Sequence, residues 1–89
     1  MDHDLVLPVD FKDYAWEVDA KGYLTGASVR VGDRLLAVTF YEPVRLAQDI
    51  AGELAGGRPF GAVRILVVER VREDDMRAAI AKMPAEFFL

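Results

Sequence analysis

The sequence predicts a small α+β domain, a two-layer α/β sandwich on one mainly antiparallel sheet of four to five strands. Short apolar runs separated by tight turns fill the first half of the chain, as in an antiparallel meander. A helix pattern and then a strand pattern follow, which predicts a parallel strand pair. The chain has 89 residues, 53% of them hydrophobic, which suffices for one core. We therefore predict the order (β)βββαβα in a single domain, residues 1–89, with two helices packed on one face.

The first half of the chain supplies the predicted meander. Residues 1–4 are polar and are expected to be frayed. The run that follows contains Pro8, which cannot donate to a strand ladder, so it is an edge strand at most. In YAWEV, residues 14–18, Tyr14, Trp16 and Val18 alternate with Ala15 and Glu17, and this alternation predicts a strand.

Two turns separate the next strands. Residues 19–22 end in Gly22, a residue free to adopt positive φ. The next strand ends at residues 27–31 and is followed by Gly32–Asp33, which predicts a two-residue hairpin turn of the primed type. Residues 34–41 are apolar on both faces, which predicts a central strand.

The second half alternates helix and strand. Pro43 opens an amphipathic helix in which Leu46, Ile50 and Leu54 recur every four residues. Residues 62–71 predict a long strand parallel to residues 34–41. A second helix begins at the acidic residues 73–75, where the helix dipole favours negative charge, and Pro84 ends it. Residues 84–89 form an apolar tail.

Composition excludes several classes of protein. The net charge is −4 and the basic residues are scattered, so we expect no nucleic-acid partner. No apolar run approaches the roughly 20 residues that span a bilayer, so we expect no membrane partner. The chain has no cysteine and no basic leader, which fits a cytoplasmic protein. Its surplus of arginine over lysine hints at a bacterial source.

The segment ELAGGRPFGAV, residues 53–63, combines glycines with an arginine and could be a phosphate loop. Phosphate loops run from strand to helix, because the N–H groups of a helix N-terminus face the anion. Here the order is helix, glycines, strand. We therefore interpret Gly56 or Gly57 as a left-handed helix cap, with Arg58 and Phe60 at the loop tip.

No catalytic constellation emerges. His3 is the only histidine and stands between two acidic residues, so it could supply metal ligands, but we expect a frayed terminus there instead. A lone histidine also leaves no material for a Ser-His-Asp or Cys-His arrangement. Glu17, Glu42 and Glu69 could converge as acid–base groups, but solvent exposure or arginine pairing explains them as well. We expect no enzyme, no cofactor and no metal.

The remaining observation is a surplus of apolar side chains. Two helices can cover one sheet face, yet the central strands are apolar on the second face as well, and the tail is apolar. This surplus indicates an interface, or else the tail and the N-terminal run fold over the second face themselves. The expected function is a non-enzymatic protein-interaction module of the immunity, antitoxin or accessory-subunit type, forming a homodimer or docking on a protein partner. Its candidate contact residues are Arg58, Phe60, Phe87, Phe88 and Leu89, together with the second sheet face. The alternative is a small-ligand-binding or regulatory domain with a pocket at Tyr14, Trp16, Tyr41 and Arg30.

Overall fold

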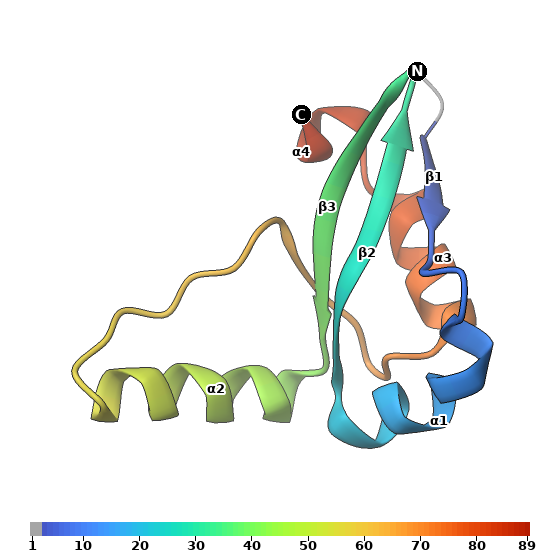
Figure 1. The fold of residues 1–89 in the computed structure, drawn as a ribbon. Helices are drawn as coiled ribbons and strands as arrows, with labels where there is room; N and C mark the ends of the chain where they lie inside the picture. The colour runs from blue at the N-terminus through green and yellow to red at the C-terminus, as the bar shows by residue number, and fades with distance from the viewer. Residues whose placement is uncertain (1–2) are drawn as a thin grey trace.

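A computed structural model describes residues 3–89 and shows a four-stranded sheet with four helices (Figure 1). The elements are β1 (His3–Val6), α1 (Phe11–Lys21), β2 (Tyr23–Val31), β3 (Arg34–Tyr41), α2 (Pro43–Ala55), β4 (Ile65–Val67), α3 (Glu73–Lys82) and α4 (Ala85–Phe88). The strand order is β1-β2-β3-β4, with β1, β2 and β3 antiparallel and β4 parallel to β3. The α+β class, the mainly antiparallel sheet and the parallel pair are confirmed.

One face of the sheet carries the hydrophobic core. Alternate residues of β2 and β3, among them Val29, Val38 and Phe40, are almost completely buried. Helices α1, α3 and α4 contribute Phe11, Val18, Met76, Ile80 and Phe88 to the same cluster. The C-terminal tail therefore packs into the core face of the sheet, with the Phe88 ring 5.4 Å from that of His3.

The prediction of a strand at residues 14–18 is wrong, because this segment lies inside α1. Phe11 and Val18 are about two helical turns apart, so they lie on the same face of the helix, and both side chains are buried. The helix is kinked at Tyr14, whose φ is −132° and ψ is 20°. Trp16 consequently points outward and is 73% exposed.

The strand predicted over residues 62–71 is limited to Ile65–Val67. Arg64 interrupts it with φ at 41°, the one non-glycine residue with positive φ in the described chain. Its guanidinium donates to the carbonyl oxygens of Phe88 at 2.7 Å and Ala37 at 3.2 Å. These two hydrogen bonds connect α4 to the sheet and offset the unfavourable backbone conformation.

The fraying expected for residues 1–4 does not extend to the described part of that segment. His3 and Asp4 begin β1, where they pair with Val31 and Arg30. The His3 Nε2 atom lies 2.8 Å from the carbonyl oxygen of Ile80 and so connects β1 with α3. Residues 1 and 2 lie outside the described residues.

Helix α2 extends away from the sheet and, with the returning connection, forms an arm comprising residues 43–64 (Figure 1). It has no fully buried residue, so it does not share the core face with α3 as the sequence predicted. The molecule measures 40 × 28 × 20 Å, with a radius of gyration of 13.3 Å. A compact domain of this length has a radius of about 12 Å, and the arm accounts for the difference.

Candidate functional site

Helix α2, the first part of the arm, begins and ends at well-defined caps. The Glu42 carboxylate accepts hydrogen bonds from the backbone N–H groups of Val44, at 3.1 Å, and Arg45. Pro43 occupies the first turn, where its missing N–H costs nothing. After the helix, Gly57 adopts φ of 78°, and the Arg58 N–H donates to the Glu53 carbonyl oxygen at 2.9 Å. The glycine segment is thus a left-handed helix terminus, as the sequence predicted.

The polar side of α2 is bonded to its own chain. The Tyr41 hydroxyl donates to one oxygen of Asp49 at 2.7 Å, and the Arg45 Nε–H donates to the other at 2.8 Å. The Arg45 guanidinium also lies 4.4 Å from the centre of the Tyr23 ring, a cation–π contact. This network fixes the helix against the end of β3.

The same network shifts two pKa values. Burial of the Tyr41 hydroxyl, reinforced by its hydrogen bond to Asp49, raises the pKa of Tyr41 to about 12. The hydrogen bond from Tyr41, and then that from Arg45, lowers the pKa of Asp49 below its ordinary value. Asp49 is therefore ionised at neutral pH and Tyr41 is protonated, the states that this hydrogen bond requires.

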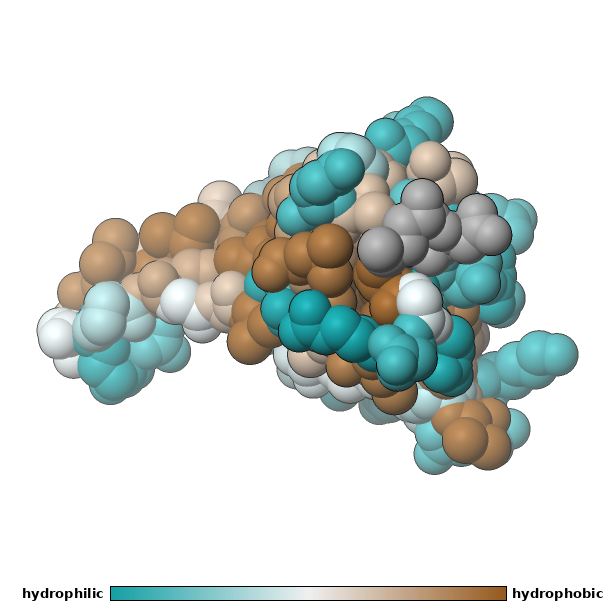
Figure 2. Space-filling view, turned by 90° about the horizontal axis from the view of Figure 1, so that it is seen from above, coloured by the Kyte–Doolittle hydropathy of each residue, from teal (hydrophilic) through white to brown (hydrophobic). Residues whose placement is uncertain are grey.

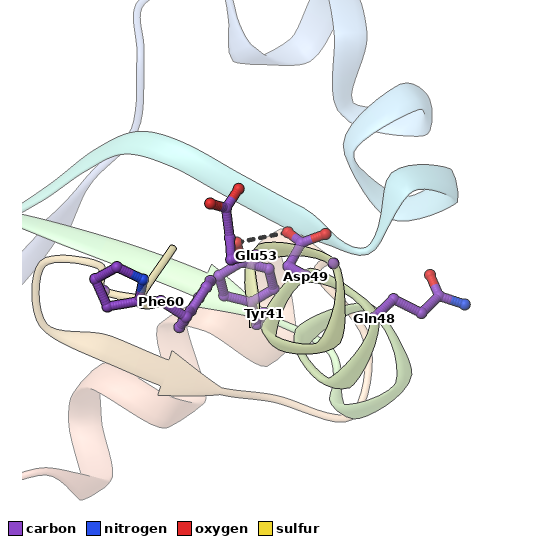
Figure 3. Close-up of a pocket in the computed structure, with 8 residues that line it drawn as sticks. Tyr41, Gln48, Asp49, Glu53 and Phe60 are labelled. Atoms are coloured by element: carbon purple, nitrogen blue, oxygen red, sulfur yellow. Dashed lines mark hydrogen bonds between the residues drawn. The ribbon is translucent and has the colours of Figure 1, made fainter. Parts of the chain in front are cut away.

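A groove of about 520 Å³ lies between α2 and the returning connection (Figure 3). It is lined by Tyr41, Gln48, Asp49, Gly52, Glu53, Pro59, Phe60 and Gly61. The Phe60 ring packs edge-on against Tyr41, with 6.1 Å between ring centres. Arg58 donates to the groove residue Glu53 at 2.7 Å. The two acidic groups of the groove, Asp49 and Glu53, are therefore each paired with an arginine of the same chain.

The opposite side of α2 is an apolar stripe that faces away from this groove. At roughly 100° per residue, a row of large side chains runs beside a row of small ones. We define the stripe as the large row Leu46, Ile50 and Leu54 and the small row Ala47, Ala51 and Ala55. Leu54 is 61% exposed, and the neighbouring Val44 is 62% exposed. In Figure 2, hydrophobic surface follows one edge of the arm. Leu46 and Ile50 are half-buried, whereas the small row is exposed. The helix thus bonds its polar side within the chain and leaves its apolar stripe only partly covered.

The second sheet face contributes less apolar surface than expected. The residues that indicated an apolar second face, Leu36, Val38, Phe40, Leu66 and Val68, are buried and belong to the core. The open face shows the alternating residues instead: Leu35 and Val67 are exposed, and Ala37 lies between them. This face adds single apolar side chains near the arm.

The structure separates the five candidate contact residues. Arg58 is exposed and paired with Glu53, while Phe60 turns inward to Tyr41. Phe87 and Leu89 are exposed at the C-terminal end. Phe88 is completely buried, so its side chain is not available to a partner in this fold. Sequence reasoning missed that the arm leaves apolar side chains exposed, although the amphipathic pattern of residues 43–55 carried the signal.

The pocket considered for a small ligand is also divided. Tyr41, Trp16 and Tyr14 line three different grooves, of about 520, 320 and 220 Å³, and Arg30 lines none of the three. One small molecule cannot contact all of these residues. The groove beside Trp16 is formed by α1 with Arg72 and Glu73, on the other side of the molecule from the arm (Figure 1).

The acidic candidates have structural partners or are exposed. Glu42 caps α2, Glu17 lies 3.9 Å from Lys21, and Glu69 is exposed. Within residues 3–89, no cluster of three or more histidine, aspartate or glutamate side chains is placed to bind a metal ion. None of the helices in this range has the length and apolar character needed to cross a membrane.

Comparison with known proteins finds no matching family model, no matching curated protein and no matching solved structure.

Proposed function

We propose that the protein is a non-enzymatic protein-interaction module, and that its binding element is the apolar stripe of α2. The observation that carries the proposal is the orientation of this helix. An amphipathic surface helix ordinarily turns its apolar side to the core. Here the polar residues Arg45, Asp49 and Glu53 bond within the chain, and Leu54 and the small row of the apolar stripe stay in solvent.

The cost of this exposure supports a binding role. Each large aliphatic side chain gains about 1.5–3 kcal/mol when it is fully buried. Leu54 and Val44 retain more than half of their accessible surface, so most of that gain is still available to a partner. Apolar surface that is continuous along one element typically marks an interface.

The charge and composition support a proposal about the type of protein and its location. We infer a cytoplasmic bacterial protein of the immunity, antitoxin or accessory-subunit type, which acts by covering or joining another polypeptide. A net charge of −4 and the absence of cysteine support this setting. Arg58, Phe87 and Leu89 remain accessible as secondary contacts.

The test compares two variants that add the same charge to opposite sides of α2. Leu54→Glu places a carboxylate in the apolar stripe, whereas Gln48→Glu places one at the exposed edge of the groove. Affinity purification from the native host and light scattering then measure association with any protein, including a second copy. We expect association of the wild type and of Gln48→Glu, and its loss in Leu54→Glu. Equal association of all three, or none by the wild type, contradicts the proposal.

A second function is favoured by the groove between α2 and the returning connection. Its volume of about 520 Å³ lies within the range of small-molecule sites, and Tyr41 and Phe60 supply two aromatic walls. We infer that a small ligand bound here would act as a regulator of the arm. Because Trp16 lies elsewhere, the test is the change in NMR signals of groove residues during titration with a metabolite panel. Unchanged Phe60 and Gly61 signals across the panel contradict it.

A further inference from the structure

We propose that the occupant of the apolar stripe is a second copy of this chain, with the two α2 helices antiparallel about a two-fold axis between Ile50 and Ala51. The inference rests on the proposed function and names its partner. It follows from the order of large and small residues along the stripe, from the position of the charges, and from the size of the surface.

The stripe is complementary to itself. In an antiparallel pair centred between Ile50 and Ala51, the two-fold axis places the large rows of the two copies along one side of the seam and the two small rows along the other. Leu54 and Ala47 lie nearest the centre line of the seam and face each other across it, while Ile50 meets Ile50 and Ala51 meets Ala51 at the two-fold axis. The small rows let the two backbones approach closely, and the large side chains pack as ridges into neighbouring grooves. A two-fold interface requires this kind of self-complementary surface.

The positions of the charges also favour a second copy of the chain in the antiparallel orientation. The charged residues of α2, Arg45, Asp49 and Glu53, are all bonded on its polar side. A second copy therefore meets no like charge across the stripe. The Glu42 carboxylate lies at the N-terminal end of α2 and Arg58 follows the C-terminal end. Both groups keep their bonds within the chain, and antiparallel pairing brings the opposite ends of the two helix dipoles close together.

The size of the surface sets the expected affinity. At 1.5 Å per residue, α2 is roughly 20 Å long. One face of such a helix is smaller than the roughly 800 Å² that each partner buries in a standard interface. We therefore expect a reversible dimer with a dissociation constant on the order of 10 µM.

Cysteine cross-linking tests the pairing and its direction, because the chain contains no cysteine. We would treat Ala47→Cys, Leu54→Cys and their mixture with a short bifunctional thiol reagent. In the antiparallel pair, position 47 faces position 54 of the other copy, whereas two copies of position 47 are separated by roughly 10 Å along the axis. The mixture is expected to cross-link several-fold faster than either variant alone. A parallel pair reverses this result, and the exposed Ala78→Cys in α3 gives the background rate.

Sedimentation equilibrium of the purified full chain provides the second test. We expect a monomer–dimer equilibrium in the wild type and in Gln48→Glu, and at least a tenfold weaker dimer in Ala51→Glu, which places a carboxylate at the axis. A strict monomer well above 100 µM overturns the homodimer, and so does a dimer unaffected by Ala51→Glu. If the monomer nevertheless binds a host protein and Leu54→Glu abolishes that binding, the proposed function survives while this inference fails. If no stripe-dependent binding of any kind occurs, both fail.

Discussion

The Tyr41–Asp49 hydrogen bond is expected to be the main polar contact that holds the arm in its outward orientation. Replacing Tyr41 by phenylalanine removes the hydroxyl and keeps the ring. The ring contacts with Tyr23, at 6.0 Å, and with Phe60, at 6.1 Å, are therefore retained. Any change measured in Tyr41→Phe then reports on the hydrogen bond from the Tyr41 hydroxyl to Asp49, which is 2.7 Å long.

The size of the effect follows from the charge and exposure of the acceptor. A hydrogen bond to a charged group contributes about 1.5–3 kcal/mol. The Asp49 side chain is 26% exposed and keeps Arg45 as a second partner, so the lower part of that range applies. We expect a loss of about 1–2 kcal/mol in the free energy of unfolding at pH 7. For a domain of this size, the melting temperature falls by roughly 5–15 °C.

The effect has a distinct pH dependence. The folded-state pKa of Asp49 is lowered, chiefly by the hydrogen bond from Tyr41. Its contribution is therefore present above the ordinary aspartate pKa of about 4 and is lost as the pH falls through the lower, folded-state pKa. The pKa of Tyr41 is raised to about 12. That contribution is present below the ordinary tyrosine pKa of about 10 and is lost as the pH rises toward 12.

Urea denaturation of the wild type and Tyr41→Phe from acid to alkaline pH measures this difference. It should be largest near neutral pH and should shrink at both extremes. The Asp49→Asn variant completes a double-mutant cycle, whose coupling energy isolates the pair. A difference under about 0.3 kcal/mol, or one that is the same at every pH, refutes the assignment of the hydrogen bond as a stabilising contact.

Three further expectations concern positions with matched controls. Phe88→Ala removes a completely buried ring and should cost about 3–5 kcal/mol in chemical denaturation, while the partly exposed Phe87→Ala should cost far less. Gly57→Ala should destabilise the fold by about 1–2 kcal/mol, because φ at Gly57 is 78°, whereas Gly52→Ala inside α2 should stabilise it by about 0.5–1 kcal/mol. An added methyl group meets no neighbouring atom at either site, so thermal unfolding of the two variants should show shifts of the melting temperature in opposite directions. In an ultraviolet titration of the three tyrosines, a transition near pH 12 should be present in the wild type and absent in Tyr41→Phe, and its persistence in the variant would assign it to another residue.

Local patterns succeeded where one backbone period ran through a long segment. The apolar spacing from Leu46 to Leu54 and the flanking proline and glycines predicted α2 closely, because helix caps are local chemistry. The apolar run at residues 34–41 predicted β3 for the same reason. The five-residue window at 14–18 misled, because alternation over so short a stretch also fits one face of a helix, and the kink at Tyr14 distorts the helical spacing.

By itself, the sequence determined the α+β class, the parallel pair that follows a helix, and the presence of an amphipathic helix with glycine at its end. These depend on residues near one another in the chain. Only the tertiary structure decided which side of α2 faces inward, because that depends on Tyr41, Asp49 and Arg45 meeting across a strand–helix junction. It also decided that Phe88 enters the core, since Arg64 holds the Phe88 carbonyl from 24 residues away. An amphipathic pattern shows that a helix has an apolar side. The contacts of the polar side determine whether the rest of the chain covers that apolar side.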